Sequence, residues 1–116
     1  MYRISKRFTF SASHQLDVPI GHPCGRVHGH NYVVELVLEA AELDAHGFIV
    51  DYRELQLFKD LVDTLLDHQH LNDVVDFEPT AENIAAYLFT QARQLWSQVC
   101  EVRVSETEKT WASYTE

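Results

Sequence analysis

Two stretches of alternating polar and apolar residues, both in the first part of the chain, constrain its fold more than any other feature. In RFTFSASH (residues 7–14), Phe8, Phe10 and Ala12 alternate with polar residues, the period expected of a strand with one buried face. A polar loop that contains proline and glycine follows, and VHGHNYVVELVLEA (residues 27–40) predicts a second, longer strand. We therefore expect these two strands to pair antiparallel.

Two amphipathic helices are expected in the middle of the chain. The segments DYRELQLFKDLVDTLLDH (residues 51–68) and AENIAAYLFTQARQLW (residues 81–96) both place apolar residues at helical spacing. Asp51, with Glu54 three residues later, is typical of an N-cap, and Thr80 is a second candidate cap. We therefore interpret Asp51 as a helix cap rather than as a catalytic carboxylate.

The end of the chain predicts a closing hairpin of two short strands, SQVCEVRVSET (residues 97–107) and TWASYTE (residues 110–116). The resulting order ββααββ predicts a single α+β domain over residues 1–116, with a four-stranded antiparallel sheet and two helices on one face. Such a sheet has two open edges with unpaired N–H and C=O groups, which pairing between copies of the chain would satisfy. We therefore expect a homo-oligomer.

The charge and the cysteine content limit the expected partners. Nine Lys and Arg against eighteen Asp and Glu give a formal net charge of -9, which argues against nucleic acid as a partner. No segment approaches the length of an apolar membrane span, and the first ten residues lack the apolar run of a signal peptide. We therefore expect a cytoplasmic protein without a membrane partner, in which Cys24 and Cys100 are reduced thiols.

The stretch PCGRVHGHNY (residues 23–32) combines one thiol with two imidazoles. His28 and His30 are two residues apart on a predicted strand, so both rings project from the same face and can bind one ion. His14 ends the preceding strand and can approach them across the hairpin. Three imidazole nitrogens with an open fourth position are typical of catalytic zinc, whereas ordinary polar surface histidines are the alternative.

Cys24 has two possible roles in such a site. Its thiolate is a strong zinc donor, and the spacing of the sequence does not exclude it as a fourth ligand. Alternatively, a nearby dication and Arg26 would lower the pKa of the thiol from about 8.5 toward neutrality. The thiolate would then act as a base or nucleophile.

Two further segments carry acids in suggestive positions. In LLDHQHLND, Asp67 directly precedes His68, and a carboxylate beside an imidazole can fix its tautomer and relay protons near neutral pH. An ordinary polar helix end is the alternative. Glu106 ends an alternating strand, where a carboxylate inside a pocket would accept the paired N–H donors of an amino-heterocycle, unless it is exposed to solvent.

Taken together, several motifs resemble those of the 6-pyruvoyl-tetrahydropterin synthase family, which includes the 6-carboxytetrahydropterin synthases. These motifs are FTFSASH, CGRVHGHNY, GFIVDYREL, LDHQHLND, PTAEN and SET, in this order. The resemblance covers nearly the whole chain. It implies the tunnelling fold, in which sheets of several subunits join edge to edge into a barrel with the helices outside. Within that family a hexamer is usual, and the active sites form between subunits.

The resemblance also implies roles for individual residues. It implies a Zn²⁺ cofactor held by three histidines, His14, His28 and His30. Cys24 is implied as the catalytic thiol, with Asp67 and His68 as its proton-transfer partners, and Glu106 as the anchor of the pterin ring. His22 and His70 are interpreted as supporting or surface groups.

The three residues between Cys24 and His28 resemble the carboxy branch of the family, because the pyruvoyl enzymes typically have a longer gap. This branch converts 7,8-dihydroneopterin triphosphate and water to 6-carboxy-5,6,7,8-tetrahydropterin, acetaldehyde and triphosphate, in the queuosine and 7-deazapurine route. The alternatives are a 6-pyruvoyl-tetrahydropterin synthase, which retains the side chain, and a non-catalytic zinc- or pterin-binding module. The sequence does not identify the triphosphate-binding residues, because it has no glycine-rich phosphate loop and its basic residues are scattered.

Overall fold

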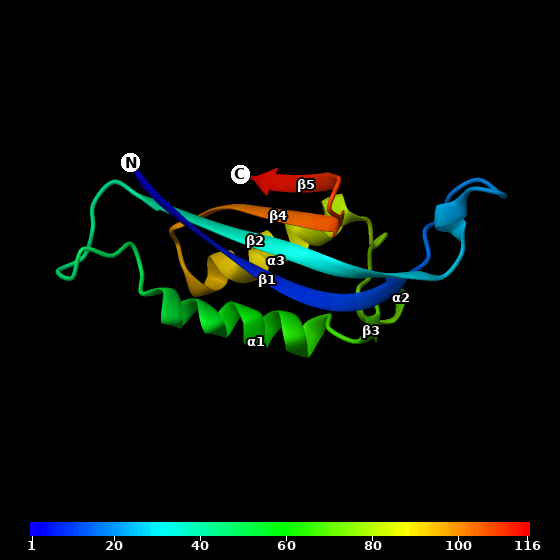
Figure 1. Ribbon diagram of the computed structural model, residues 1–116, viewed down its shortest axis with the longest axis horizontal. Helices are drawn as coiled ribbons and strands as arrows, with labels where there is room; N and C mark the ends of the chain where they lie inside the picture. Colours follow the sequence, from blue (N-terminus) through cyan, green and yellow to red (C-terminus); the bar gives the residue numbers. More distant parts are fainter.

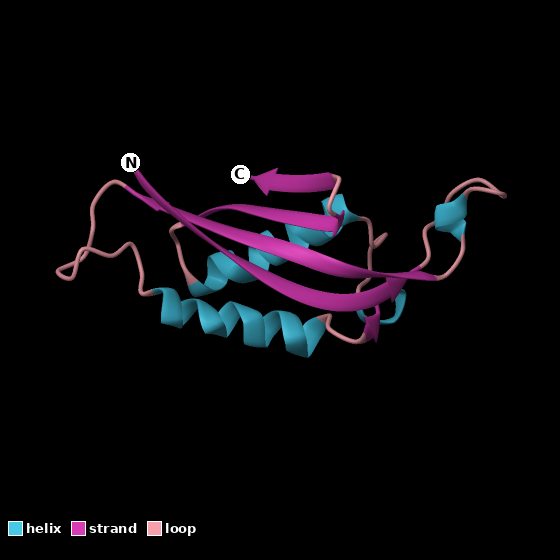
Figure 2. Cartoon of the chain, viewed as in Figure 1, coloured by secondary structure: helices cyan, strands magenta, loops and turns pink.

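The computed structural model describes residues 1–116 and contains one twisted sheet with helices against one of its faces (Figure 1). The strands are β1 (Tyr2–His14), β2 (His28–Ala40), β3 (Gln69–His70), β4 (Val99–Thr107) and β5 (Thr110–Thr115). The helices are α1 (Gln56–Leu65), α2 (Leu71–Val74) and α3 (Ala81–Leu95). Both long helices, α1 and α3, lie along the same side of the sheet (Figure 2), so the predicted α+β class is confirmed.

The sheet has the order β3-β1-β2-β4-β5 and therefore one strand more than expected. The three pairs among β1, β2, β4 and β5 are antiparallel, as predicted, whereas β3 is parallel to β1. The predicted counts of four strands and two helices were wrong because β3 spans two residues and α2 spans four. Elements this short cannot display a period of 2 or 3.6, so the sequence pattern does not reveal them.

The first two strands are longer and more regular than any other pair in the sheet. Their register runs without interruption from Tyr2 opposite Ala40 to His14 opposite His28. The strand β1 begins at Tyr2, five residues before the predicted segment. The residues before Phe8 are exposed or only partly buried, so they lack the clear polar and apolar alternation on which the prediction rested. The end of the pair at His14 and His28 lies beside the loop that joins the two strands.

The hydrophobic core fills the space between the sheet and the two long helices. Its aromatic contacts include Phe8 against Phe58 of α1, with ring centroids 5.4 Å apart, and Phe10 stacked on Tyr32 at 4.6 Å. Val62 of α1 and Leu88 of α3 are completely buried. Full burial of an aliphatic or aromatic side chain stabilises a fold by about 1.5–3 kcal/mol, so this layer holds both helices against the sheet.

Both expected cap residues accept backbone hydrogen bonds. Thr80 accepts from the N–H of Asn83 and caps α3, as predicted. Asp51 accepts from the N–H of Arg53 and thereby caps a 3₁₀ helix, Tyr52–Leu55, which precedes α1. Hydrogen bonds from the Arg53 side chain and backbone lower the pKa of Asp51 to about 2. Asp51 is therefore a structural cap, and α1 begins later than the sequence suggested.

The face of the sheet away from the helices carries a network of charged side chains. Glu35 on β2 accepts from Arg7 on β1 and from Arg103 on β4, each at 3.0 Å. The ring of Trp111 on β5 lies under both guanidinium groups, with centroid distances of 5.3 Å and 4.7 Å. Partial burial favours the protonated form of Glu35, but the two arginines outweigh it and lower the pKa of this carboxyl. This network ties four strands together.

None of the helices combines the length and the apolar character that crossing a bilayer requires.

Candidate functional site

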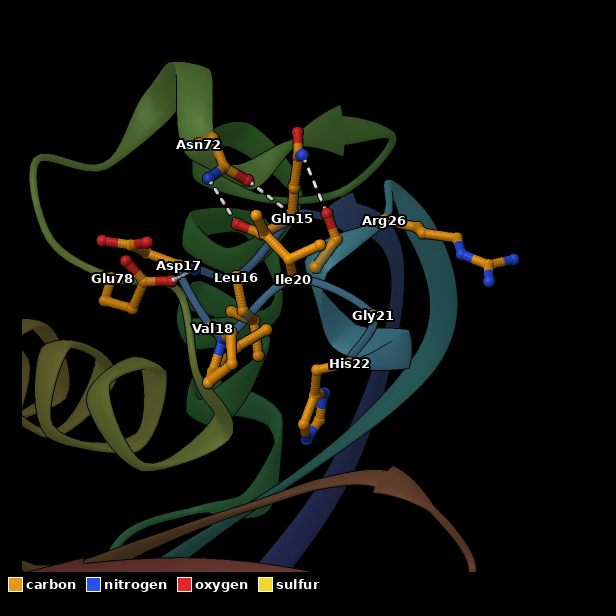
Figure 3. Close-up of a pocket in the computed structure, with 12 residues that line it drawn as sticks. Gln15, Leu16, Asp17, Val18, Ile20, Gly21, His22, Arg26, Asn72 and Glu78 are labelled. Carbon is orange, nitrogen blue, oxygen red and sulfur yellow. Dashed lines mark hydrogen bonds between the residues drawn. The ribbon is translucent and has the colours of Figure 1, made fainter.

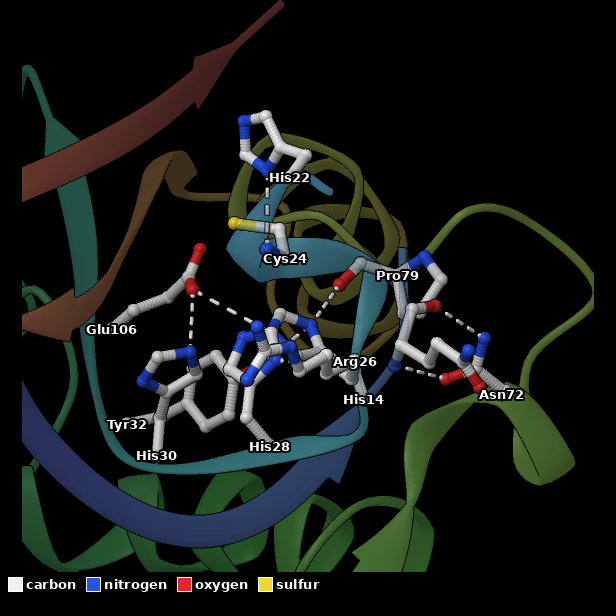
Figure 4. Close-up of polar contacts among 11 residues, drawn as sticks. His14, His22, Cys24, Arg26, His28, His30, Tyr32, Asn72, Pro79 and Glu106 are labelled. Atoms are coloured by element: carbon white, nitrogen blue, oxygen red, sulfur yellow. Dashed lines mark hydrogen bonds and ion pairs between the residues drawn. The ribbon is translucent and has the colours of Figure 1, made fainter. Parts of the chain in front are cut away.

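Antiparallel pairing of β1 and β2 brings three imidazoles together at one end of the sheet (Figure 4). His14 lies opposite His28, and His30 projects from the same face of β2. The ring centroids are 4.5 Å apart for His14 and His28, 5.1 Å for His14 and His30, and 4.9 Å for His28 and His30. The structure therefore gathers the three histidines that the sequence singled out as metal ligands.

Backbone carbonyls fix the orientation of two of these rings. Nδ1 of His14 lies 2.7 Å from the carbonyl oxygen of Pro79, and Nδ1 of His28 lies 2.7 Å from that of Arg26. A carbonyl oxygen only accepts hydrogen bonds, so each Nδ1 carries the hydrogen and donates it. In a neutral imidazole the other nitrogen, Nε2, then presents a lone pair.

Those two Nε2 atoms, of His14 and His28, are 2.9 Å apart. Two lone pairs at this distance repel each other unless a cation lies between them. The Nε2 atom of His30 is also buried and has no hydrogen-bond partner. An orphaned nitrogen beside two opposed lone pairs, each backed by a carbonyl that holds its ring, fits the donor set and the outer support of a zinc site.

Glu106 on β4 reaches the same cluster. Its carboxylate oxygen lies 2.8 Å from Nε2 of His30, without hydrogen-bond geometry, and 3.6 Å from Nε2 of His14. The ligand atoms of the four residues all lie within 4.8 Å of one another. This proximity was missed by sequence reasoning, although the alternation of β4 already places Glu106 on the same face as the buried Val102 and Val104.

Burial shifts the protonation equilibrium of one ring of the cluster, that of His30. Desolvation of the His30 ring lowers the pKa of this imidazole, and the neighbouring His14 and His28 act in the same direction, whereas Glu106 opposes them. Burial also raises the pKa of Tyr32, whose hydroxyl lies 3.2 Å from Nδ1 of His14. The lowered pKa favours the neutral form of His30, in which imidazole binds metal ions.

Cys24 lies on a 3₁₀ helix, Pro23–Gly25, in the loop between β1 and β2. Its thiol is free and half-buried, as is that of Cys100. The group of ligand atoms within 4.8 Å of one another consists of the three histidines and Glu106, without the Cys24 sulfur. The Cys24 sulfur is therefore not among the ligand atoms that the single chain brings together.

The acid and imidazole of the second predicted cluster are in direct contact. Asp67 Oδ2 lies 2.8 Å from Nδ1 of His68, and Oδ1 accepts from the N–H of Ser11 at 2.8 Å. The bond from Ser11 is the main cause that lowers the pKa of Asp67, followed by the contact with His68. Since His68 also donates its N–H to the Ser11 carbonyl at 2.7 Å, the pair is pinned to β1 from both sides.

His68 itself has an unusual conformation. It has a φ of 58° and is the only residue other than glycine with a positive φ. Its side chain is 83% exposed and forms an ion pair with Asp67. Within one chain, no hydrogen bond or ion pair joins this pair to Cys24. Residues other than glycine in the left-handed region cost energy and concentrate at functional sites, so this backbone conformation marks His68 as a candidate functional residue.

Two surface cavities flank these groups. One, of about 530 Å³, is enclosed by the loop around Asp17 and Ile20 together with Asn72 and Glu78, and it contains none of the clustered imidazoles (Figure 3). The other, of about 450 Å³, is lined by residues that include both His30 and His68. Of the imidazole cluster and the acid–imidazole pair, only His30 and His68 line this second cavity.

Residues 3–116 match the profile of the family described as 6-pyruvoyl tetrahydropterin synthase. The chain belongs to this family. Two relatives named 6-carboxy-5,6,7,8-tetrahydropterin synthase, from Synechocystis sp. and Bacillus subtilis, are 36% and 33% identical to it. The alignments cover 81% of this chain and 77% of the Synechocystis protein, and 97% of this chain and 84% of the Bacillus protein.

A solved structure, that of Caenorhabditis elegans 6-pyruvoyl tetrahydropterin synthase, is similar to the chain with a TM-score of 0.88 and 28% identity. The similarity covers 99% of this chain and 95% of the nematode protein. The match confirms the predicted membership of the 6-pyruvoyl tetrahydropterin synthase family and, for the single chain, the predicted tunnelling fold.

Proposed function

We propose that this chain is a zinc-dependent 6-carboxytetrahydropterin synthase. It would convert 7,8-dihydroneopterin triphosphate and water to 6-carboxy-5,6,7,8-tetrahydropterin, acetaldehyde and triphosphate, in the queuosine and 7-deazapurine route. The observation that carries the proposal is the approach of the His14 and His28 Nε2 atoms to 2.9 Å beside the orphaned Nε2 of His30, in a member of this family. The names of the bacterial relatives and the short gap between Cys24 and His28 support the carboxy branch.

The three histidines would hold the metal through their Nε2 atoms. When bound there, Zn²⁺ polarises oxygen atoms of the substrate side chain and stabilises negative charge that develops on them. The carbonyls of Pro79 and Arg26 keep the rings of His14 and His28 in the required tautomer, since each accepts the Nδ1 hydrogen. Glu106 would accept N–H donors of the pterin ring, which orients the side chain of the substrate toward the histidines.

Protons would be moved by Cys24 and by the pair of Asp67 and His68. As a thiolate, Cys24 would remove a proton from the substrate side chain. Asp67 stays ionised because Ser11 donates to it, and it holds Nδ1 of His68, so that Nε2 of His68 is left to exchange protons. The exposed position of His68 gives this nitrogen access to a bound substrate.

The exposure of His68 supports a homo-oligomer in which a second copy covers this side chain. The His68 side chain is 83% exposed, and its ion pair is with Asp67. A second copy of the chain would bring the Cys24 of one protomer to the His68 of another, which agrees with the hexameric barrel expected from the family. A thiolate base also requires a reducing compartment, as expected of a cytoplasmic protein. Sedimentation as a monomer at micromolar concentration would contradict the assembly.

A 6-pyruvoyl-tetrahydropterin synthase is the second candidate, because the nematode protein with the TM-score of 0.88 carries that name. The deciding experiment incubates the zinc-loaded protein with 7,8-dihydroneopterin triphosphate, traps acetaldehyde and identifies the pterin by mass spectrometry. Acetaldehyde and a carboxylated tetrahydropterin support the proposal, whereas a pyruvoyl product without acetaldehyde supports the second candidate. A protein that binds zinc and leaves the substrate unchanged would indicate a non-catalytic binding module. Cys24→Ala serves as the inactive control that still binds zinc.

A further inference from the structure

Both polar backbone atoms of Cys24 are bonded within the loop that carries it. The carbonyl oxygen accepts from the N–H of Leu16 at 2.9 Å, which is a contact between backbone atoms. The N–H donates to Nδ1 of the His22 side chain at 3.1 Å (Figure 4). Of the two bonds that hold the Cys24 backbone, only the one to His22 depends on the identity of a side chain.

The local sequence explains why a histidine performs this role. His22 is the N-cap of the 3₁₀ helix Pro23–Gly25 and has extended backbone angles, φ -72° and ψ 132°. Pro23 has no N–H, so the first N–H of the turn that needs an acceptor is that of Cys24. The carbonyl of His22 also accepts from the N–H of Gly25 at 3.0 Å. His22 therefore closes the turn with both its side chain and its backbone.

We propose that His22 is a positioning residue for Cys24, which fixes the turn so that the thiol is directed at the reacting part of the substrate. This inference rests on the role of Cys24 in the proposed function. The ring acts through the backbone, because its contact is with the Cys24 N–H. Since Nδ1 accepts this bond, the imidazole carries its hydrogen on Nε2.

Two substitutions separate capping from any other action of the ring. Asparagine is among the best N-cap residues, because its side-chain oxygen accepts the same kind of backbone bond, whereas alanine accepts none. We expect His22→Ala to lower kcat by about 3- to 30-fold, the range that corresponds to loss of a cap, with KM and zinc content unchanged. His22→Asn is expected to restore kcat to within about twofold of the wild type.

A measurement that does not depend on activity tests the same contact. In the zinc-loaded oligomer, hydrogen exchange at the Cys24 amide is expected to be fast in His22→Ala and protected in His22→Asn and in the wild type. A protected Cys24 amide in His22→Ala would overturn the inference, whatever the rate. So would a His22→Asn enzyme as slow as His22→Ala, since the ring itself would then be required. If the wild type forms no pterin product, the proposed function fails, and amide exchange alone decides whether His22 holds the turn.

Discussion

The Nε2 atoms of His14 and His28 face each other at 2.9 Å, while the Nδ1 atom of each ring donates to a backbone carbonyl. Neither ring can satisfy the other in this arrangement, because both nitrogens present lone pairs. A cation that accepts both lone pairs removes the repulsion. Binding of a metal ion between the rings would therefore stabilise this end of the sheet.

Removal of zinc is expected to lower the thermal stability of the protein. A ligand present at one hundred times its Kd stabilises a folded protein by about 2.7 kcal/mol, which corresponds to a rise in Tm of about 10 °C for a domain of this size. His28→Ala is expected to bind no zinc, as measured by metal analysis. Its Tm is expected to lack the increase caused by zinc, as measured by scanning calorimetry. His46→Ala, at an exposed turn outside the cluster, is the matched control. A His28→Ala protein that binds zinc as tightly as the wild type would refute the assignment.

Glu106→Gln separates substrate binding from metal binding at the cluster. The amide is close in shape to the carboxylate but no longer carries the charge that would pair with two N–H donors of the pterin ring. We expect kcat/KM to fall by about a hundredfold or more, since hydrogen bonds to a charged group contribute about 1.5–3 kcal/mol each. The zinc content should remain one per chain. Loss of zinc in this variant would instead identify Glu106 as a ligand.

Asp67→Asn is expected to lower kcat by about 10²- to 10⁴-fold, because His68 loses the carboxylate that fixes its tautomer. The asparagine oxygen can still accept from Ser11, so the fold should be retained. Asp63→Asn on α1 provides a control that removes a surface carboxylate without effect on kcat. Equal rates for Asp67→Asn and the wild type would exclude Asp67 from proton transfer.

The same carboxylate predicts a dependence of stability on pH. The pKa of Asp67 is lower in the folded chain than in the unfolded chain, where it is about 3.9. Its contribution to the free energy of unfolding is therefore complete above pH about 5 and is lost as the pH falls through the folded pKa. Urea denaturation of wild type and Asp67→Asn should show a difference at pH 6 that narrows below pH about 4. A difference that widens on acidification would contradict the shift.

Glu35→Gln is expected to destabilise the sheet by about 1–3 kcal/mol, because Arg7 and Arg103 both lose a charged acceptor that is only 13% exposed. Glu39→Gln is the matched control on the same strand, since Glu39 is 30% exposed and pairs with Arg3 alone. Exposed pairs contribute at most about 1 kcal/mol. The midpoints of urea denaturation at neutral pH measure the change in stability that each of the two substitutions causes. Equal effects of the two substitutions would show that the Glu35 network adds nothing beyond a surface ion pair.

Much of this architecture was predictable because periodicity reports which face of an element is buried. The alternation around Phe8 and Phe10 and the helical spacing of Phe58 and Val62 all match the core that forms. The histidine cluster was predictable for the same reason, since residues two apart on a strand share a face. Thr80 could be assigned as a cap because its side chain acts on a neighbour only three residues away.

What escaped prediction depends on contacts between distant parts of the chain. The carbonyl of Pro79 that orients His14 is 65 positions away and leaves no trace in the pattern of side chains. The position of Glu106 beside His30 follows from the register of β4 on β2, and register is set by the whole sheet. The bond between His22 and Cys24 was hidden for another reason, because histidine is not among the usual N-cap residues.

The direct opposition of His14 and His28 in the register of β1 and β2 also bears on how the chain reaches its native state. A slip of one residue would turn one of these rings to the other face of the sheet, and a slip of two would move it away by about 7 Å. Only the hairpin in the correct register would then offer three nitrogens to one ion. Zinc binding would therefore shift the equilibrium from misregistered hairpins toward the correct one by mass action. The supply of zinc during synthesis would thus affect the fraction of chains that form the sheet in the correct register. A cell short of zinc should lose the yield of folded protein before it loses the activity of each folded molecule.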